Sequence, residues 1–255
     1  MGFFSFANDD AQSRAFPAGL DLSAIMRQVY MWLAIGLAVC FGIAYLIGAP
    51  VRAALESGNI RALEQALSSS IIGNPAVSII SLIVYIGMAF AFYPVVMRAK
   101  PAIGAALFLA FTAVFGVMLS TAMIAYAQTD VMLAFLATSG MFGAMTFIGL
   151  TTKADLSKLG SILTMAVIGL LIASVINIFA RSEAIMWIIT YAGVIIFTGF
   201  TAYDTWWIKN NAAQIAQSGD SLAGQRIALI GAFRLFLDFV NLFIYLLRII
   251  GASRD

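Results

Sequence analysis

Three ionisable side chains interrupt the last two apolar runs of this sequence, and they have the clearest capacity for chemistry. Asp204 lies near the end of one run, and Arg234 and Asp238 lie within the next. A charge in membrane hydrocarbon costs about 2.5–3.5 kcal/mol on insertion scales, so such groups face protein or water and mark functional sites by default. Two carboxylates that meet in a poorly hydrated site cannot both ionise cheaply. We therefore predict that Asp204 and Asp238 form a pair that holds a proton or a cation.

The same residues also allow a purely structural interpretation. Arg234 and Asp238 are four residues apart, so on a helix they could neutralise each other as a buried pair. Asp204 could be an ordinary interfacial residue, because Trp206 and Trp207 follow it and tryptophans gather at membrane surfaces. Arg98, near the end of an earlier apolar run, is at the depth where it could pair with Asp204.

The composition places these charges in a membrane protein. The 255 residues are 62% hydrophobic and only 10% charged, and the mean hydropathy is +0.99. A soluble domain is closer to half apolar and a quarter charged. Histidine is absent and Cys40 is the single cysteine, which excludes His-ligated metals, Ser-His-Asp triads, intrachain disulfides and cysteine zinc sites. A net charge of +2 does not describe a nucleic-acid surface, so we expect no nucleic-acid partner and no cofactor.

Seven apolar runs are long enough to span a bilayer, which needs about 20 residues. They cover residues 29–47, 77–96, 103–125, 131–150, 161–179, 184–208 and 227–247. Their unbroken apolar character predicts helices rather than barrel strands. Asn74-Pro75 supplies a cap and a first-turn proline for the second run. Most connections are short, so successive helices should form antiparallel hairpins.

A stripe of polar residues predicts where the last helix lies. Its members recur at steps of three and four residues, which places them on one face of a helix: Arg234, Asp238, Asn241, Tyr245 and Arg248. Such a helix belongs inside the bundle, with the other six around it. The sequence therefore predicts an all-α, polytopic membrane protein.

The predicted domain organisation is a cytoplasmic segment at 1–28, a transmembrane domain at 29–250 and a tail at 251–255. Its orientation follows from the distribution of Lys and Arg in the loops. With the N-terminus inside, the cytoplasmic segments hold eight: Arg14, Arg27, Arg98, Lys100, Lys153, Lys158, Lys209 and Arg226. The outer segments hold five: Arg52, Arg61, Arg181, Arg248 and Arg254. This difference favours a cytoplasmic N-terminus and an external C-terminus.

The longest predicted connection outside the N-terminal segment covers residues 48–74. Ile60, Leu63 and Leu67 recur there at helical spacing, among charged residues. This pattern predicts a short helix that either lies in the membrane interface or packs on the protein surface.

Three segments of the sequence closely resemble the bacterial branch of the Bax inhibitor-1 family, also called the transmembrane Bax inhibitor motif proteins. They are MFGAMTFIGLTTKADLSKLG, FTGFTAYDT and LFLDFVNLFIYLLRIIG, and the resemblance runs from about Tyr30 to Gly251. It implies seven helices, with three hairpins around a central last helix, in a bacterial inner membrane. It also implies a pH-sensitive calcium leak, in which Asp204 and Asp238 match the paired aspartate sensor. Arg98 matches an arginine that latches the first aspartate.

Arg234 departs from the family pattern, in which a small uncharged residue occurs at that position. A permanent cation within reach of Asp238 favours the ionised carboxylate and opposes a passing divalent ion. Calcium also takes six to eight oxygen ligands, so Asp204 and Asp238 would provide a weak transit site rather than a store. We regard Arg234 and Asn241 as candidate modulators of this site.

Other functional classes fit parts of the pattern. A proton-coupled carrier could use the same carboxylates, and a non-transporting partner of membrane quality-control or stress proteins would need neither. An intramembrane aspartyl protease would match Tyr203-Asp204, but its second motif, Gly-x-Gly-Asp, is replaced here by Leu235-Phe236-Leu237-Asp238. We therefore expect no enzyme activity, and we expect lipid, calcium or protons, and membrane proteins as partners.

Overall fold

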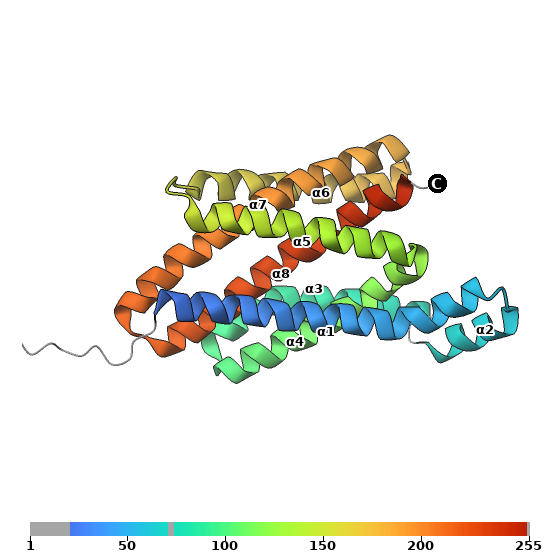
Figure 1. Cartoon of the computed structure of the whole chain (residues 1–255), viewed down its shortest axis with the longest axis horizontal. Helices are drawn as coiled ribbons and strands as arrows, with labels where there is room; N and C mark the ends of the chain where they lie inside the picture. The colour runs from blue at the N-terminus through green and yellow to red at the C-terminus, as the bar shows by residue number, and fades with distance from the viewer. Residues whose placement is uncertain (1–20, 71–73, 254–255) are drawn as a thin grey trace, which may run out of the picture.

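A computed structural model of the chain describes residues 21–70 and 74–253, and every regular element within these ranges is an α-helix (Figure 1). The helices are α1 (Leu22–Glu56), α2 (Ile60–Ser69), α3 (Pro75–Arg98), α4 (Pro101–Ala125), α5 (Gln128–Thr151), α6 (Ser157–Ala180), α7 (Glu183–Ser218) and α8 (Ser221–Ala252). Seven of them are long and apolar enough to cross a membrane, and each predicted span lies within one of the seven. The predicted all-α, seven-span fold is confirmed.

Short polar side chains fix where several helices begin. The Asn74 side chain accepts a hydrogen bond from the Ala76 amide at 3.0 Å, and Pro75 occupies the first turn of α3, as predicted. Asp220 caps α8 in the same way, accepting from the amides of Leu222 and Ala223 at 2.9 and 3.0 Å. These caps satisfy backbone donors that the first turn of a helix leaves unpaired.

The short predicted helix in the first long connection is also present. It forms α2, ten residues that contact α1, and its Ile60 side chain is 72% exposed. The helix lies beyond the end of the main bundle (Figure 1). Its position in the membrane interface stays a prediction.

The outer helices form two groups of three on either side of α8 (Figure 1). In one group α1 and α3 both pack on α4, and in the other α5 and α6 both pack on α7. α8 contacts α1, α3, α4, α5 and α7, and 72% of its most apolar 18-residue window is buried, against 11–39% in the other spans. The predicted central position of the last helix is confirmed. Among consecutive spans, α3–α4, α6–α7 and α7–α8 are close neighbours, whereas the main neighbour of α1 is α4.

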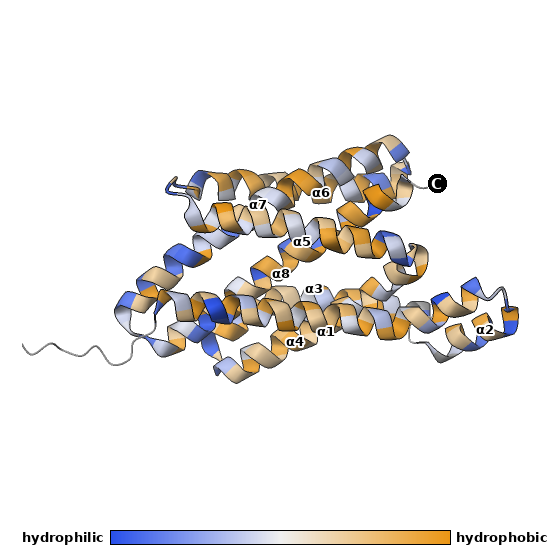
Figure 2. Cartoon of the chain, in the orientation of Figure 1, coloured by the Kyte–Doolittle hydropathy of each residue, from blue (hydrophilic) through white to orange (hydrophobic). Residues whose placement is uncertain are grey.

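Aromatic side chains join α8 to the group of α1, α3 and α4. Phe233 stacks on Phe92 of α3 with ring centroids 4.0 Å apart, and the buried Phe236 makes edge-to-face contacts with aromatic rings of α4. Offset and edge contacts are the favourable arrangements for such rings. The outer faces are apolar as well, since Phe90 and Phe179 are each 82% exposed (Figure 2). Large apolar side chains on the outside of a bundle suit a lipid environment.

The link between the last two spans differs from the expectation. A connection of about 18 residues is predicted between Ile208 and Ile227, but α7 continues to Ser218 and α8 begins at Ser221. Gly219, with φ of 71°, ends α7 in the left-handed conformation that glycine adopts most readily. Polar residues continue a helix as easily as apolar ones when their side chains reach water. At about 1.5 Å per residue, the 36 residues of α7 therefore extend well beyond a hydrocarbon core of about 30 Å.

The orientation of the bundle gives the first testable prediction. α1 begins at one end of the bundle and α8 ends at the other, as an odd number of spans requires (Figure 1). Because the loop charges favour a cytoplasmic N-terminus, reporters fused to the C-terminus and inserted at 153–158 should report the outside and the inside respectively. Both reporters on one side would contradict the seven-span topology.

Candidate functional site

The contact between α7 and α8 brings Asp204 and Arg234 into a two-pronged ion pair. Arg234 Nε donates to Asp204 Oδ2 at 3.0 Å, and Nη2 donates to Oδ1 at 2.5 Å. The planar guanidinium matches both carboxylate oxygens at once, which makes this the strongest geometry for such a pair. Arg234 thus pairs with a carboxylate on the neighbouring helix, rather than with Asp238 four residues along its own.

Asp238 lies beside this pair and has fewer hydrogen bonds than Asp204. Both aspartates are only 4% exposed, and Asp204 and Arg234 are near enough to act electrostatically on the Asp238 carboxylate. Oδ2 of Asp238 is buried and has no hydrogen-bond partner among the described residues. One guanidinium is therefore placed to compensate two carboxylates, and only one of them is directly bonded to it.

The indole of Trp207 forms one wall of the site. The Arg234 guanidinium lies over this ring at 4.5 Å from its centroid and over the Tyr203 ring at 5.8 Å. The interpretation of Trp207 as a residue of an interface belt is therefore incomplete, because its ring face is occupied by a cation. Its spacing contained the signal: Trp207 follows Asp204 by three residues and so lies on the same helix face.

Three members of the polar stripe of α8, Arg234, Tyr245 and Arg248, contact α7 in one antiparallel register. Going from the Asp204–Arg234 pair to the next two contacts, a step of 11 and then three residues back along α7 matches the same step forward along α8. Arg248 Nη1 donates to Thr190 Oγ1 at 3.2 Å, and Tyr245 packs over Gly193. Asn241 is an exception, because its amide donates to Leu237 O at 2.8 Å within its own helix. The structure therefore gives Asn241 no direct contact with the aspartates.

Arg98 lies apart from the acidic pair. It occupies the last turn of α3 and is exposed, and Asp204 is bonded to Arg234 in its place. The expected Arg98–Asp204 contact is thus absent from the described residues, because α3 packs on α4 and lightly on α8 rather than on α7. The role of Arg98 as a latch on the closed state stays a prediction.

Near Asp204, α7 packs closely on its neighbours through a glycine of α5 and through side-chain hydroxyls. A Cβ added to Gly149 of α5 would stand 2.5 Å from Ala202 O and 2.8 Å from Thr205 Cβ, so the two backbones approach as closely as glycine allows. On the next side, the Tyr30 hydroxyl of α1 lies beside the hydroxyls of Thr146 and Thr205. Thr205, the residue next to Asp204, is therefore enclosed by α1 and α5.

Lys209 and Arg226 fasten α7 and α8, near the turn that joins them, to both helix groups. Lys209 Nζ donates to Leu150 O at 2.7 Å, and Arg226 Nη2 donates to Ala99 O at 3.3 Å. Both acceptors belong to the last turn or cap of a helix, where carbonyls are left free and the helix dipole favours a positive charge. Lys209 and Arg226, which are among the charges that predict the orientation, therefore also join helices by hydrogen bonds.

The site offers few ligands to a metal ion. The described residues contain no group of three or more Asp, Glu, Cys or His side chains that could hold one. A calcium ion at Asp204 and Asp238 would need carbonyl or water oxygens to complete its shell. It would also have to displace Arg234, whose guanidinium already fills the space between α7 and α8 at Asp204.

Comparisons with known proteins extend over almost the whole chain. A family model described as inhibitor of apoptosis-promoting Bax1 matches residues 22–255. The chain is 36% identical to the inner membrane protein YbhL of Escherichia coli strain K12, over 91% of this chain and 93% of that protein. It is 33% identical to an uncharacterised protein of Deinococcus radiodurans, over 90% of both chains, and 32% identical to an uncharacterised membrane protein of Streptococcus pyogenes, over 91% and 94%.

The second prediction concerns the stability that the ion pair gives to the α7–α8 contact. Arg234→Gln leaves the Asp204 carboxylate buried and unpaired, so it should lower the free energy of unfolding by about 3 kcal/mol. The double variant with Asp204→Asn should recover most of this loss, because no uncompensated charge remains. Reversible unfolding in detergent micelles measures both values.

Arg98→Gln is the matched control, and as an exposed change it should stay within about 0.5 kcal/mol of the wild type. Additive losses in the double variant would show that Arg234 and Asp204 do not act as a pair.

Proposed function

Because the chain belongs to the Bax inhibitor-1 family of membrane proteins, we propose that it is a pH-sensitive calcium leak whose gate is formed by Asp204, Asp238 and Arg234. The observation that carries the proposal is the pair of buried carboxylates, Asp204 and Asp238, that lie beside one guanidinium where α7 meets the central helix α8. We propose transport rather than catalysis, with calcium as cargo and no cofactor. The protein would lie in a bacterial inner membrane with a cytoplasmic N-terminus.

The described conformation corresponds to the closed state in this proposal. Arg234 joins α8 to Asp204 of α7, and Lys209 and Arg226 fasten the same hairpin to α5 and to the cap of α3. An internal guanidinium at the acidic pair occupies the place that a permeant cation would need. Opening therefore requires that Arg234 leave Asp204 or that α7 and α8 separate.

The charge balance of the site gives the direction of the pH response. With Asp238 protonated, Asp204 and Arg234 form a neutral pair and nothing attracts a second cation. When Asp238 ionises, the site carries one excess negative charge in a poorly hydrated place, which repels Asp204 and draws in a cation. The conductive form should accordingly gain as pH rises and be lost in acid. Tyr203 of α7 and the Tyr30–Thr146–Thr205 hydroxyls are the other titratable or polar groups nearby.

A proton-coupled carrier is the second candidate function. The observation in its favour is Asp238 Oδ2, a buried acceptor without a partner among the described residues, where a proton could be held. A non-transporting role beside membrane quality-control proteins remains a third interpretation of the family membership. Protease activity is disfavoured because Leu235 and Phe236, which precede the second aspartate, are fully buried and bulky.

The third prediction tests the acidic pair through its pH dependence. Calcium flux into liposomes that contain only this protein should rise between about pH 5 and 8, the range in which perturbed carboxylates titrate. Asp204→Asn and Asp238→Asn should each remove most of that dependence. Wild-type pH profiles in both variants would make the pair structural and would remove the gate from the proposal. Proton flux without calcium flux would favour the carrier.

The fourth prediction separates the two arginines in the same assay. Arg234→Ser removes the internal cation, so ionisation of the pair becomes harder and the midpoint of the flux profile should move up by about one pH unit or more. Calcium then meets no resident competitor, so the flux above the midpoint should also increase. Arg98→Ala should raise the leak at neutral pH if Arg98 acts as a latch on the closed state. Unchanged flux in a folded Arg98→Ala protein would remove it from the gate.

A further inference from the structure

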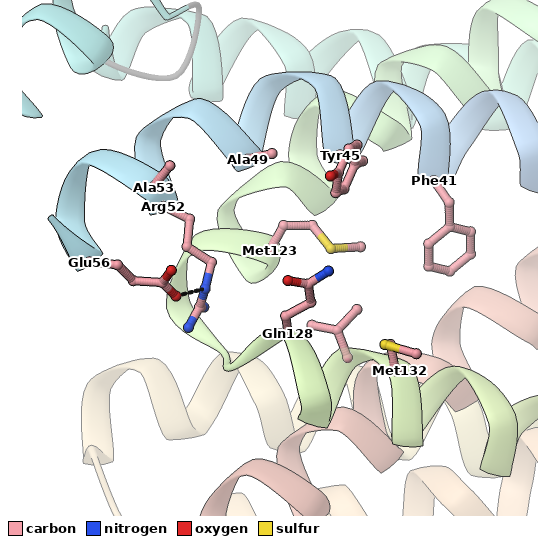
Figure 3. A pocket seen from close by; sticks show the side chains of 10 residues that line it. Phe41, Tyr45, Ala49, Arg52, Ala53, Glu56, Met123, Gln128 and Met132 are labelled. Atoms are coloured by element: carbon pink, nitrogen blue, oxygen red, sulfur yellow. Dashed lines mark hydrogen bonds and ion pairs between the residues drawn. The ribbon is translucent and has the colours of Figure 1, made fainter. Parts of the chain in front are cut away.

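A groove separate from the acidic pair lies between the C-terminal half of α1 and the start of α5. Its volume is about 390 Å³, and Met123 of α4 contributes to its lining (Figure 3). Arg52 and Glu56 stand at one end of it and Phe41 stands at the other (Figure 3). The groove therefore has a charged end and an apolar end.

The apolar part of the groove is open to the surroundings of the bundle. Met132 and Tyr45, on its two sides, are 59% and 58% exposed. α1 and α5 belong to different helix groups, and their side chains meet at the apolar end of the groove, where the Phe41 and Phe135 rings contact edge to face with centroids 5.2 Å apart. Between that contact and Arg52 the space is left unfilled. Apolar cavities do not hold stable water, and unfilled space forfeits dispersion contacts. In a bilayer the natural occupant of such a space is a hydrocarbon chain.

The charged end supplies both a donor and an acceptor. Arg52 Nε donates to Glu56 Oε1 at 2.8 Å, and Nη1 donates to Tyr126 O and, at 3.4 Å, to Ile124 O at the end of α4. The hydrogen bonds that Arg52 and Glu56 form among the described residues use Nε, Nη1 and Oε1, which leaves Arg52 Nη2 and Glu56 Oε2 available to a ligand. Together they offer one positive and one negative contact to a ligand, with no net charge.

The height of this end matches the headgroup layer of a membrane. Arg52 follows Ile47, the last residue of the predicted span, by five residues, or about 7.5 Å along a helix. A bilayer of about 40–45 Å with a hydrocarbon core of about 30 Å leaves about 5–7.5 Å for the headgroups on each side. Gln128, three residues before the α5 span begins at Val131, turns its amide into the groove at nearly the same height (Figure 3).

We propose that this groove binds one glycerophospholipid with a primary-ammonium headgroup. Its acyl chain lies along Phe41, Met123 and Met132, and its phosphate accepts from Arg52 Nη2. The ammonium donates to Glu56 Oε2, and the Gln128 amide faces the glycerol esters. An anionic headgroup would bring an uncompensated negative charge to Glu56, and a quaternary ammonium has no N–H to donate to it.

Native mass spectrometry of the full-length protein in detergent tests this site without reference to ion flux. The protein is offered equal amounts of phosphatidylethanolamine, phosphatidylcholine and phosphatidylglycerol with the same acyl chains. We expect one retained phosphatidylethanolamine per chain, preferred about tenfold over each of the others, the factor that one charge-assisted hydrogen bond supplies. Equal retention of the three lipids would overturn the headgroup assignment.

Two substitutions locate the lipid, each with a control on an exposed position outside the groove. Glu56→Gln should abolish the preference for ethanolamine over choline, whereas Glu64→Gln on α2 should keep it. Ala49→Trp places a ring in the groove and should reduce retention of all three lipids, whereas Leu46→Trp, one turn away on the lipid-facing side of α1, should not. Undiminished retention by a folded Ala49→Trp protein would overturn the groove as the binding site.

Discussion

The arrangement of the helices depends on one interaction, the two-pronged ion pair between Asp204 and Arg234. Each charge alone would be costly in an apolar bundle, and together they are tolerated only where α7 and α8 face each other in a fixed register. That register also sets Arg248 against Thr190 and Tyr245 against Gly193. The Asp204–Arg234 pair therefore specifies the register of α8 against α7, and this role does not depend on how much the pair adds to the free energy of unfolding.

Around the contact between α7 and α8, both helix groups use the same two kinds of packing. Aromatic rings fill the space against α8 on both sides, from α4 onto Phe236 and from α5 onto Phe239. Glycine lets backbones approach closely within each group, at Gly116 between α4 and α1 and at Gly149 between α5 and α7. The two groups meet each other mainly through α8, which leaves a groove between α1 and α5 at the end that carries Arg52. The buried ion pair and the groove are thus separate consequences of one architecture.

Arg234 gives this member of the family an internal cation at its acidic pair. The presence of Arg234 can be seen in the sequence, and its effect on Asp238 follows from charge alone. The main partner of Arg234 cannot be predicted in the same way, because spacing along α8 points to Asp238 as much as to any other carboxylate. A guanidinium on a long side chain reaches across to the neighbouring helix, where it also finds the face of Trp207.

Length, hydropathy and periodicity by themselves determined the all-α class, the seven spans, the helix starts at Asn74 and the central place of the last helix. These are local properties, since they depend on residues near one another in the chain. Only the tertiary structure decided that Asp204 binds Arg234 rather than Arg98, that part of the polar stripe contacts α7, and that 209–226 continues as two helices. These features depend on which helices are neighbours and how each is rotated, and in an almost uniformly apolar bundle many rotations have the same hydropathy pattern.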